Sequence, residues 1–253
     1  MTDVPDQLIA RIAADSKYWL WINDQLVIFE GGLKRGPSPS GTYYDPVDIA
    51  PYLTKGSNTI AILLWHFGKD GFSHINSGKA ALLFEAIAPG LEIVSDASWQ
   101  CALYEAYQNT EAPFPNYRMP ESNIRFDARQ AITNWNRTSF EGSLPGAVCV
   151  GKAGKAPFGE LVERPIPQWK NSGLLSYVSV RESLRGDTLF CRLPYNAQIT
   201  PYLKVEAEAG KTIHIRMDNY EGGSERNVRA EYITHEGEQE YESYGWMNGH
   251  EVY

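Results

Sequence analysis

The sequence predicts an all-β protein built of antiparallel sandwiches. Short apolar or alternating runs recur along its 253 residues, and Gly, Pro, Asn and Asp separate them. Helical periodicity is scarce: the best stretch, residues 127–135, predicts one short helix at most. Many short strands at this spacing with few helices are typical of antiparallel sandwiches.

The strands are predicted in order from these runs. The pair Asn23-Asp24 tolerates positive φ and predicts a two-residue turn between the second and third strands. Further turns are predicted at residues 89–90 and 209–211. The predicted strands are 8–14, 18–22, 25–30, 58–65, 79–88, 91–96, 146–152, 174–180, 202–209, 211–218 and 228–235.

The run "YWLWI" at residues 18–22 is apolar on both faces of its strand. Tyr18, Leu20 and Ile22 share one face, and Trp19 and Trp21 share the other. A strand of this kind is expected at the centre of a sheet that is covered on both sides. A sugar-stacking platform is the alternative interpretation of the two Trp residues.

Composition and charge limit the classes of partner that this protein is expected to bind. Seven Trp and 15 Tyr exceed what an average core needs, as in all-β proteins and in proteins that bind sugars. The net charge of −8, without a basic run longer than two residues, argues against a nucleic-acid partner and a polybasic membrane patch. No signal peptide or membrane span is visible. The compartment stays open between the cytoplasm and, if a leader was removed, the periplasm or the exterior.

Several kinds of chemical site are missing from the sequence. Cys101, Cys149 and Cys191 form no CxxC element, so we expect buried free thiols and no zinc or redox site. There is no G-x-S-x-G elbow and no Gly-rich phosphate loop. We therefore expect no cofactor and no metal, and nothing indicates a structural calcium ion.

Two domains are predicted. Residues 151–173 are rich in Gly, Pro and Lys, as a linker would be, so we place the boundary near residue 165. The first domain spans residues 1–165 and the second spans 166–253. The sequence is still aromatic and strand-like at Tyr253, so we expect this chain to be part of something longer.

A pattern in the first sixty residues resembles the galactose-binding-like jelly roll of many glycoside hydrolases. A strand there ends in a hairpin, and a "D-I-x-x-x-L-x-x-G-x-N" segment leads into the next strands. Asp24 stands where the hairpin usually has Gly. The matching residues are Asn23, Asp48, Ile49, Leu53, Gly56, Asn58 and Ile60.

Later segments resemble the bacterial α-L-rhamnosidases, of the glycoside hydrolase family 78 type. The resemblance extends over nearly the whole chain, although the stretch at 192–202 keeps only Asn196 of the family pattern. The matching residues are Asp96, Trp99, Asp127, Ala128, Arg129, Leu161, Pro165, Ile166, Pro167, Asn227, Arg229, Ala230, Tyr232, Gly237, Tyr241, Gly249 and Tyr253.

The resemblance implies a non-catalytic role. The family hydrolyses terminal α-L-rhamnosides with inversion, by two acidic residues of an (α/α)6 barrel of several hundred residues that this chain lacks. It implies a galactose-binding-like jelly roll, a second antiparallel sandwich and no catalytic residue. The implied partners are a rhamnose-containing glycan or glycoside and a downstream catalytic barrel. A stand-alone carbohydrate-binding protein and a complete small lyase or hydrolase are the alternatives.

The segment 65–79, "WHFGKDGFSHINSGK", is the predicted site of ligand contact. Sugar recognition needs flat apolar rings and polar groups together, and this loop between two strands has both. The alternative is that Trp65 ends a buried strand and the rest is a solvated connection. Two Tyr residues at the end of the loop 31–46 could line the same end. The candidates are Trp65, His66, Phe67, Lys69, Asp70, Phe72, His74, Tyr43 and Tyr44.

Two sets of acidic residues are interpreted as structural rather than catalytic. Glu236, Glu238, Glu240 and Glu242 alternate, so they share one strand face, as on a solvated edge strand. An acid–base pair or a calcium site is the alternative interpretation. We predict that Asp127 and Arg129 form a structural ion pair or a strand-end contact rather than a catalytic pair.

Overall fold

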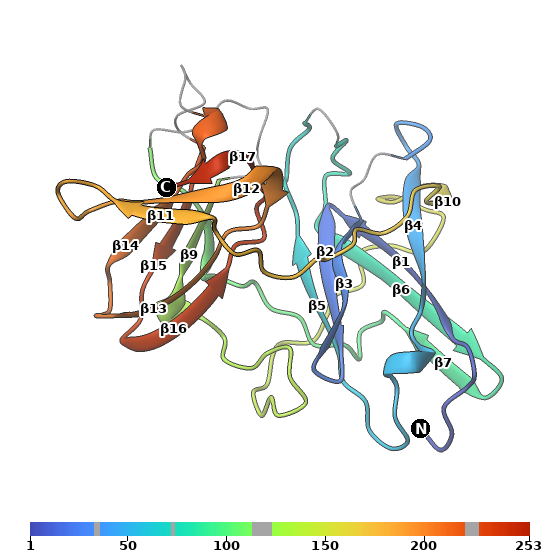
Figure 1. Ribbon diagram of the computed structural model, residues 1–253. Helices are drawn as coiled ribbons and strands as arrows, with labels where there is room; N and C mark the ends of the chain where they lie inside the picture. Colours follow the sequence, from blue (N-terminus) through green and yellow to red (C-terminus); the bar gives the residue numbers. More distant parts are fainter. Residues whose placement is uncertain (33–35, 72–73, 113–122, 221–227) are drawn as a thin grey trace. The chain divides into compact units, whose positions relative to one another are not determined.

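The computed structural model describes residues 1–32, 36–71, 74–112, 123–220 and 228–253. Strands dominate this part of the chain, and its helical elements are short 3-10 turns such as η1 (Ala50–Tyr52). The all-β prediction is confirmed. Two compact units are present (Figure 1): residues 1–103 with 133–171, and residues 104–132 with 172–253.

The first unit holds a five-stranded and a three-stranded sheet. The larger sheet has the order β10-β4-β1-β6-β7 and the smaller one β3-β2-β5. Their inward side chains form one apolar core, so the two sheets are the layers of a sandwich. The strands are β1 (Ile9–Asp15), β2 (Lys17–Ile22), β3 (Gln25–Gly32), β4 (Thr42–Asp48), β5 (Ile60–Trp65), β6 (Ala81–Ala88), β7 (Leu91–Val94) and β10 (Leu161–Glu163).

The strand β2 is central and covered on both faces, as predicted. Figure 1 shows it between β3 and β5, and all six of its residues are buried. Its Tyr18 face joins the sandwich core. On the other face Trp19 is fully buried and stacks on Trp65, with ring centroids 6.3 Å apart, while the edge of Trp21 meets Trp135 at 5.2 Å. Both Trp are therefore core residues of this unit and not an exposed platform.

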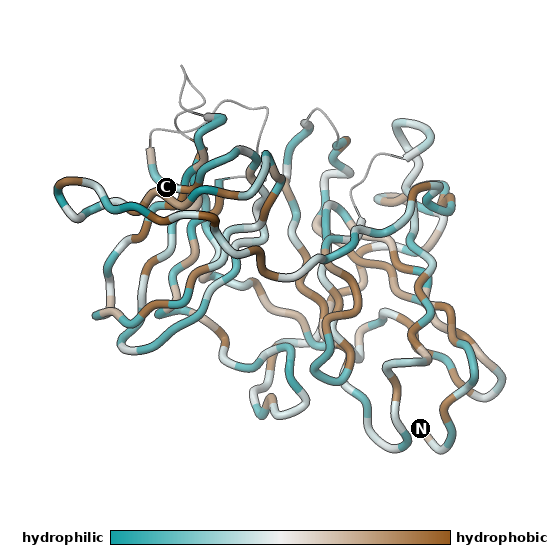
Figure 2. The backbone as a smooth tube through the Cα atoms, viewed as in Figure 1, coloured by the Kyte–Doolittle hydropathy of each residue, from teal (hydrophilic) through white to brown (hydrophobic). Residues whose placement is uncertain are grey.

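The turn after β2 has the predicted geometry. Asn23 and Asp24 have φ values of 47° and 69°, the left-handed values of a tight hairpin. The Asn23 side chain donates to the backbone oxygen of Tyr52 at 2.8 Å and to Asn58 Oδ1 at 2.7 Å. The motif residues Asn23 and Asn58 thus join the hairpin to the segment that precedes β5. Figure 2 shows the apolar residues of this unit concentrated along its strands.

The second unit is assembled from three smaller sheets. A stack of Phe126, Tyr232 and Tyr241, with centroids 4.6–6.1 Å apart, forms part of its core. The sheet orders are β11-β12-β17, β13-β16 and β14-β15-β9-β8. The strands are β8 (Tyr107–Asn109), β9 (Ile124–Asp127), β11 (Ser179–Glu182), β12 (Leu189–Ile199), β13 (Tyr202–Ala207), β14 (Thr212–Ile215), β15 (Ala230–Ile233), β16 (Gly237–Glu242) and β17 (Met247–Val252).

Among the described residues two strand pairs are parallel, which the sequence analysis did not predict. β10 pairs with β4, and β9 pairs with β15. In each pair the strands are more than 100 residues apart in sequence, as in the register Leu161↔Thr42. Parallel pairing requires a long connection rather than a hairpin, so no local turn signal marks it.

Several local predictions were wrong. Residues 146–152 make one isolated bridge at Gly146 instead of a strand. Tyr43 and Tyr44 lie in β4, not in a loop. All three cysteines are free, but Cys101 and Cys149 are exposed rather than buried. Residues 127–135 contain the 3-10 turn η3 (Ala128–Gln130), which agrees with the prediction of one short helix at most.

The predicted linker is partly structured. Residues 161–163 form β10 on the edge of the five-stranded sheet, and the compact units divide between residues 171 and 172. The second unit also takes in residues 104–132, which the sequence analysis placed in the first domain. The domain boundary near residue 165 stays a prediction.

The structure agrees with the edge-strand interpretation for Glu238 and Glu240 and with the predicted ion pair of Asp127 and Arg129. Glu238 and Glu240 are exposed on β16, and Lys204 of β13 reaches them at 2.7 and 3.2 Å. Asp127 accepts hydrogen bonds from the Nε and Nη2 atoms of Arg129 at 2.9 and 2.7 Å and also caps η3. These Arg129 bonds lower the pKa of Asp127.

Candidate functional site

The predicted ligand loop is anchored to the first unit by its own aromatic residues. Trp65 ends β5 and stacks on Trp19. Phe67 packs edge-on against Trp65 and against the ring of His74, with centroids 5.1 Å apart in both pairs. These side chains are therefore turned toward the protein, in line with the alternative interpretation of a buried strand end.

A buried polar cluster at the end of β1 holds the same loop. His74 Nε2 lies 3.1 Å from Ser16 Oγ and 3.2 Å from Asp15 Oδ1, and the Ser77 amide donates to the other carboxylate oxygen at 2.6 Å. The His66 ring nitrogen lies 3.2 Å from the backbone oxygen of Asp15. Asp15 and Ser16 are fully buried, and His74 is nearly so.

This cluster has the residue types of a catalytic triad but not its geometry. Burial alone would raise the pKa of Asp15, but hydrogen bonds from His74, Ser77 and Ser16 outweigh it and hold the pKa well below its usual range. In a triad the carboxylate and the hydroxyl use opposite ring nitrogens. Here both approach the same Nε2 of His74. The cluster is a structural anchor of residues 66–71 and 74–77.

The other predicted ligand residues are dispersed. Lys69 and Asp70 are exposed, and Asp70 accepts a hydrogen bond from the Asn76 amide at 2.7 Å. Phe72 lies outside the described residues. In β4, Tyr43 and Tyr44 are half-buried, and the Tyr44 hydroxyl donates to Glu163 at 3.4 Å. The loop therefore remains a proposal as a ligand site, and its described residues do not line the pocket described next.

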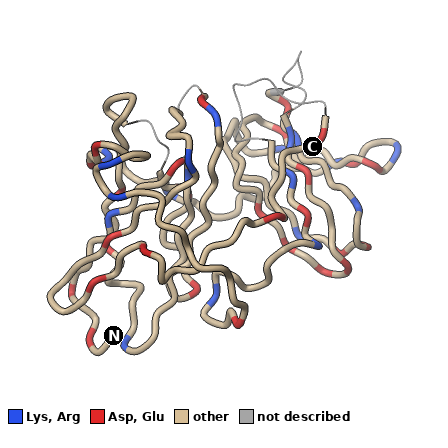
Figure 3. The backbone as a smooth tube through the Cα atoms, turned by 180° about the vertical axis from the view of Figure 1, so that it is seen from behind, with Lys and Arg blue, Asp and Glu red and all other residues tan. Residues whose placement is uncertain are grey.

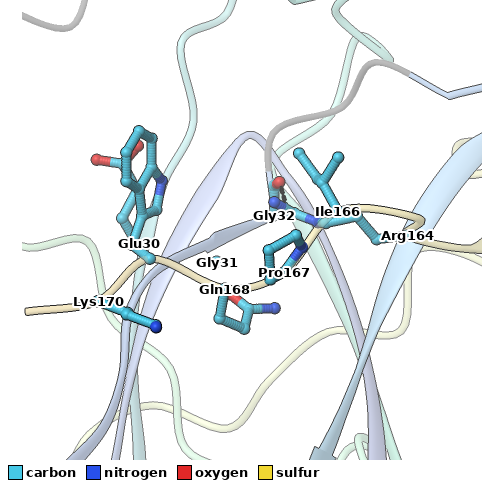
Figure 4. A pocket seen from close by; sticks show the side chains of 9 residues that line it. Glu30, Gly31, Gly32, Arg164, Ile166, Pro167, Gln168 and Lys170 are labelled. Carbon is cyan, nitrogen blue, oxygen red and sulfur yellow. Dashed lines mark hydrogen bonds between the residues drawn. The ribbon is translucent and has the colours of Figure 1, made fainter.

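The first unit contains a pocket of about 400 Å³ where residues 164–170 cross the end of β3 (Figure 4). We call it the crossover pocket. Its apolar wall comes from the crossing segment and its base from β3. The lining residues are Glu30, Gly31, Gly32, Arg164, Ile166, Pro167, Gln168, Trp169 and Lys170.

The base of the crossover pocket is fixed by a buried ion pair. Arg164 Nε lies 2.6 Å from Asp45 Oδ1, and the Arg164 guanidinium also donates to the Gly32 backbone oxygen. The Tyr18 hydroxyl donates to Asp45 Oδ2 at 2.8 Å. Because four elements meet in these bonds, the start of the crossing segment is held tightly against β3 and β4.

A second buried ion pair lies on the β3 side. Lys17 Nζ contacts Glu30 Oε1 at 2.8 Å, and both side chains are almost fully buried. Glu30 has a φ of 62°, an uncommon conformation for a residue other than Gly. This conformation is found next to the pocket, and such strain is often concentrated at functional positions.

The outer wall carries an exposed Trp. Trp169 is 59% exposed and Ile166 63% exposed, although both are large apolar side chains. The Gln168 Oε1 atom is buried and accepts no hydrogen bond from any described residue. The sequence analysis missed this site because the segment looked like a linker. The signal that could have found it is a Trp between polar residues, two positions after Pro167.

Other kinds of site are not found in the described part of the chain. It holds no group of three or more His, Cys, Asp or Glu side chains placed to bind a metal. Among the described residues, no helix has both the length and the apolar character needed to cross a membrane. Figure 3 shows acidic and basic residues interspersed along each unit rather than gathered in a basic patch.

Comparison with known proteins gives a consistent likeness. No family model matches the sequence, and no curated protein matches it. Among solved structures, an α-L-rhamnosidase from Dictyoglomus thermophilum matches with a TM-score of 0.72 and 19% identity over 100% of this chain. An α-L-rhamnosidase from Aspergillus terreus matches with a TM-score of 0.71 and 19% identity over 100% of this chain. The Streptomyces avermitilis α-L-rhamnosidase complexed with L-rhamnose matches with a TM-score of 0.69 and 18% identity over 98% of this chain.

The likeness concerns the fold of a part of those enzymes. This chain spans 29%, 30% and 25% of the three matched chains. The predicted resemblance to a region of the α-L-rhamnosidases is confirmed at the level of the fold.

Proposed function

We propose that this chain is a non-catalytic accessory region of an α-L-rhamnosidase-like glycoside hydrolase that acts on terminal α-L-rhamnosides. The observation that carries the proposal is the match of the whole chain to less than a third of several such enzymes. The five-stranded and three-stranded sheets of the first unit further support a galactose-binding-like jelly roll.

The buried carboxylates support a role without chemistry. Asp15, Glu30, Asp45, Asp127 and Glu231 each bond to a basic side chain of the described structure. An inverting glycosidase needs an acid and a base carboxyl group on either side of a sugar, with the acid held protonated by a raised pKa. The pKa of Asp15 and that of Asp127 are shifted in the opposite direction.

A deletion series tests the supporting role. The open reading frame is sequenced beyond this region, and the encoded protein is produced with and without residues 1–253. We expect the shortened protein to unfold at a lower temperature and to hydrolyse an aryl α-L-rhamnoside more slowly. Equal stability and equal turnover by the shortened protein would refute the proposal, as would turnover of the aryl rhamnoside by the purified 253-residue chain.

The second candidate is a stand-alone carbohydrate-binding protein. The exposed Trp169 on the rim of the crossover pocket favours it. The two candidates differ in their dependence on a catalytic domain. An isolated chain that binds a rhamnosylated glycan, encoded in a gene without a glycosidase domain, would favour the stand-alone protein.

A further inference from the structure

We propose that the crossover pocket binds one pyranose ring of an uncharged sugar, with Trp169 as its stacking surface. This inference rests on the proposed function, because it gives the accessory region a binding site and a ligand class. It moves the site from the predicted loop at 65–79 to residues 30–32 and 164–170.

The apolar side of the pocket fits the C–H face of a sugar ring. Ile166, Pro167 and Trp169 line it within four consecutive positions of the crossing segment. The Trp169 side chain is 59% exposed, which leaves its flat ring available to a ligand. Aromatic side chains provide a large rigid contact area at a low entropic cost, so they recur as the main contributors to binding.

The polar groups fit sugar hydroxyls. Glu30 offers carboxylate acceptors, Lys170 offers ammonium donors and the Gln168 amide offers both. The Gln168 Oε1 atom already lies buried without a hydrogen bond from a described residue. A buried acceptor in this state costs free energy that a ligand hydroxyl would recover.

The charges favour an uncharged ligand. Lys17 neutralises Glu30, and Asp45 neutralises Arg164. Of the two basic side chains that line the pocket, Arg164 is paired with Asp45, and Lys170 makes no ion pair with an acidic group of the described residues. A phosphate or carboxylate ligand typically needs two or more converging cationic groups or a bidentate Arg. Arg164 cannot provide this, because its Nε already contacts Asp45 and one of its terminal nitrogens already donates to Gly32.

The size of the pocket is sufficient for one sugar ring. Its volume of about 400 Å³ lies in the lower part of the range for small-molecule sites. The bonds of Arg164 to Asp45 and Gly32 fix its base before any ligand arrives. A preformed site loses less conformational entropy on binding.

The test measures sugar binding by the 253-residue chain. Calorimetric titrations use methyl α-L-rhamnopyranoside, methyl α-D-glucopyranoside and inorganic phosphate, with the wild type and with Trp169→Ala and Gln168→Ala. The matched control is Tyr195→Ala, because Tyr195 is an aromatic residue of the same exposure, 59%, on β12. Heteronuclear NMR of the indole N–H groups shows which Trp responds.

We expect at least one glycoside to bind and to shift the Trp169 indole signal. Trp169→Ala should weaken that binding by about tenfold or more, while Tyr195→Ala should leave it unchanged. Binding that survives Trp169→Ala would overturn the pocket assignment and leave a carbohydrate-binding role intact. Tighter binding of phosphate than of either glycoside would overturn the ligand class. No binding of either glycoside would overturn the inference, whereas the deletion series would still decide the supporting role.

Discussion

Asp24, at the tip of the β2–β3 hairpin, holds Thr138, which lies 114 residues further along the chain. The Thr138 hydroxyl donates to Asp24 Oδ2 at 2.9 Å, and the Thr138 amide donates to the other carboxylate oxygen. These bonds lower the pKa of Asp24. The bonds to Thr138 give a physical reason for an Asp at this position, although Gly would adopt the positive φ of the turn with less strain.

Replacing Asp24 with Gly should release the segment around Thr138 without opening the hairpin. Gly accepts the positive φ of this turn, but it removes both bonds to Thr138. We expect faster cleavage in residues 133–142 under limited proteolysis, with little change in near-ultraviolet circular dichroism. Asp187→Gly is the control, because within the described structure the Asp187 side chain bonds only to the nearby Ser183 and Thr188. Equal cleavage of the two variants would contradict the prediction.

Two Trp residues should differ sharply in their contribution to stability. Trp19 is fully buried between Phe29 and Trp65, so Trp19→Ala should cost about 3–5 kcal/mol. Trp169→Ala removes an exposed side chain and should change stability by less than about 0.5 kcal/mol. Urea unfolding followed by far-ultraviolet circular dichroism measures both, and similar losses would show that one burial assignment is wrong.

Asp15 should make the free energy of unfolding depend on pH in the acidic range. Because its pKa in the folded protein is lowered, its contribution is complete above the pKa of the unfolded chain, about 4, and is lost as the pH falls toward the folded value. Asp15→Asn should therefore cost on the order of 2 kcal/mol at pH 7, and this difference should shrink as the pH falls below about 4. Unfolding free energies at pH 7, 5 and 3 test it.

The control for Asp15 is Asp3→Asn, which alters an exposed ion pair with Lys55. Exposed pairs of this kind contribute little, so this variant should follow the wild type at every pH. A constant difference between Asp15→Asn and wild type from pH 7 to pH 3 would contradict the lowered pKa of Asp15.

Removing Arg164 should leave a buried charge without its partner. Arg164→Met takes the cation from Asp45, which is 1% exposed, and should cost about 3–5 kcal/mol. Arg164→Lys should rescue only part of this loss, because an ammonium cannot reach Asp45 and Gly32 in the same fork geometry. The double variant Arg164→Met with Asp45→Asn should be more stable than Arg164→Met alone. Thermal unfolding of the three variants checks this order.

The sequence predicted the parts of the fold that local pattern controls. The alternation in β2, the turn at Asn23-Asp24 and the paired Asp127 and Arg129 all follow from residues within a few positions of each other. The sequence analysis failed where the pairing partner of a strand lies far away in the sequence. Nothing near Tyr43 and Tyr44 signals that β10 will pair alongside β4, because a parallel partner comes from a distant segment.

The same distinction applies to the candidate sites. The sequence alone determined that the chain is all-β, that Trp19 and Trp21 lie inside, and that aromatic and polar residues are interleaved in the loop 65–79. Only the tertiary structure decided that this loop is tied down by Asp15 and Ser16, and that a pocket forms elsewhere. Its base joins Gly32 to Arg164, 132 residues apart. Hydrophobic periodicity is a local property that can be read along the chain, whereas a pocket depends on which distant segments pack together.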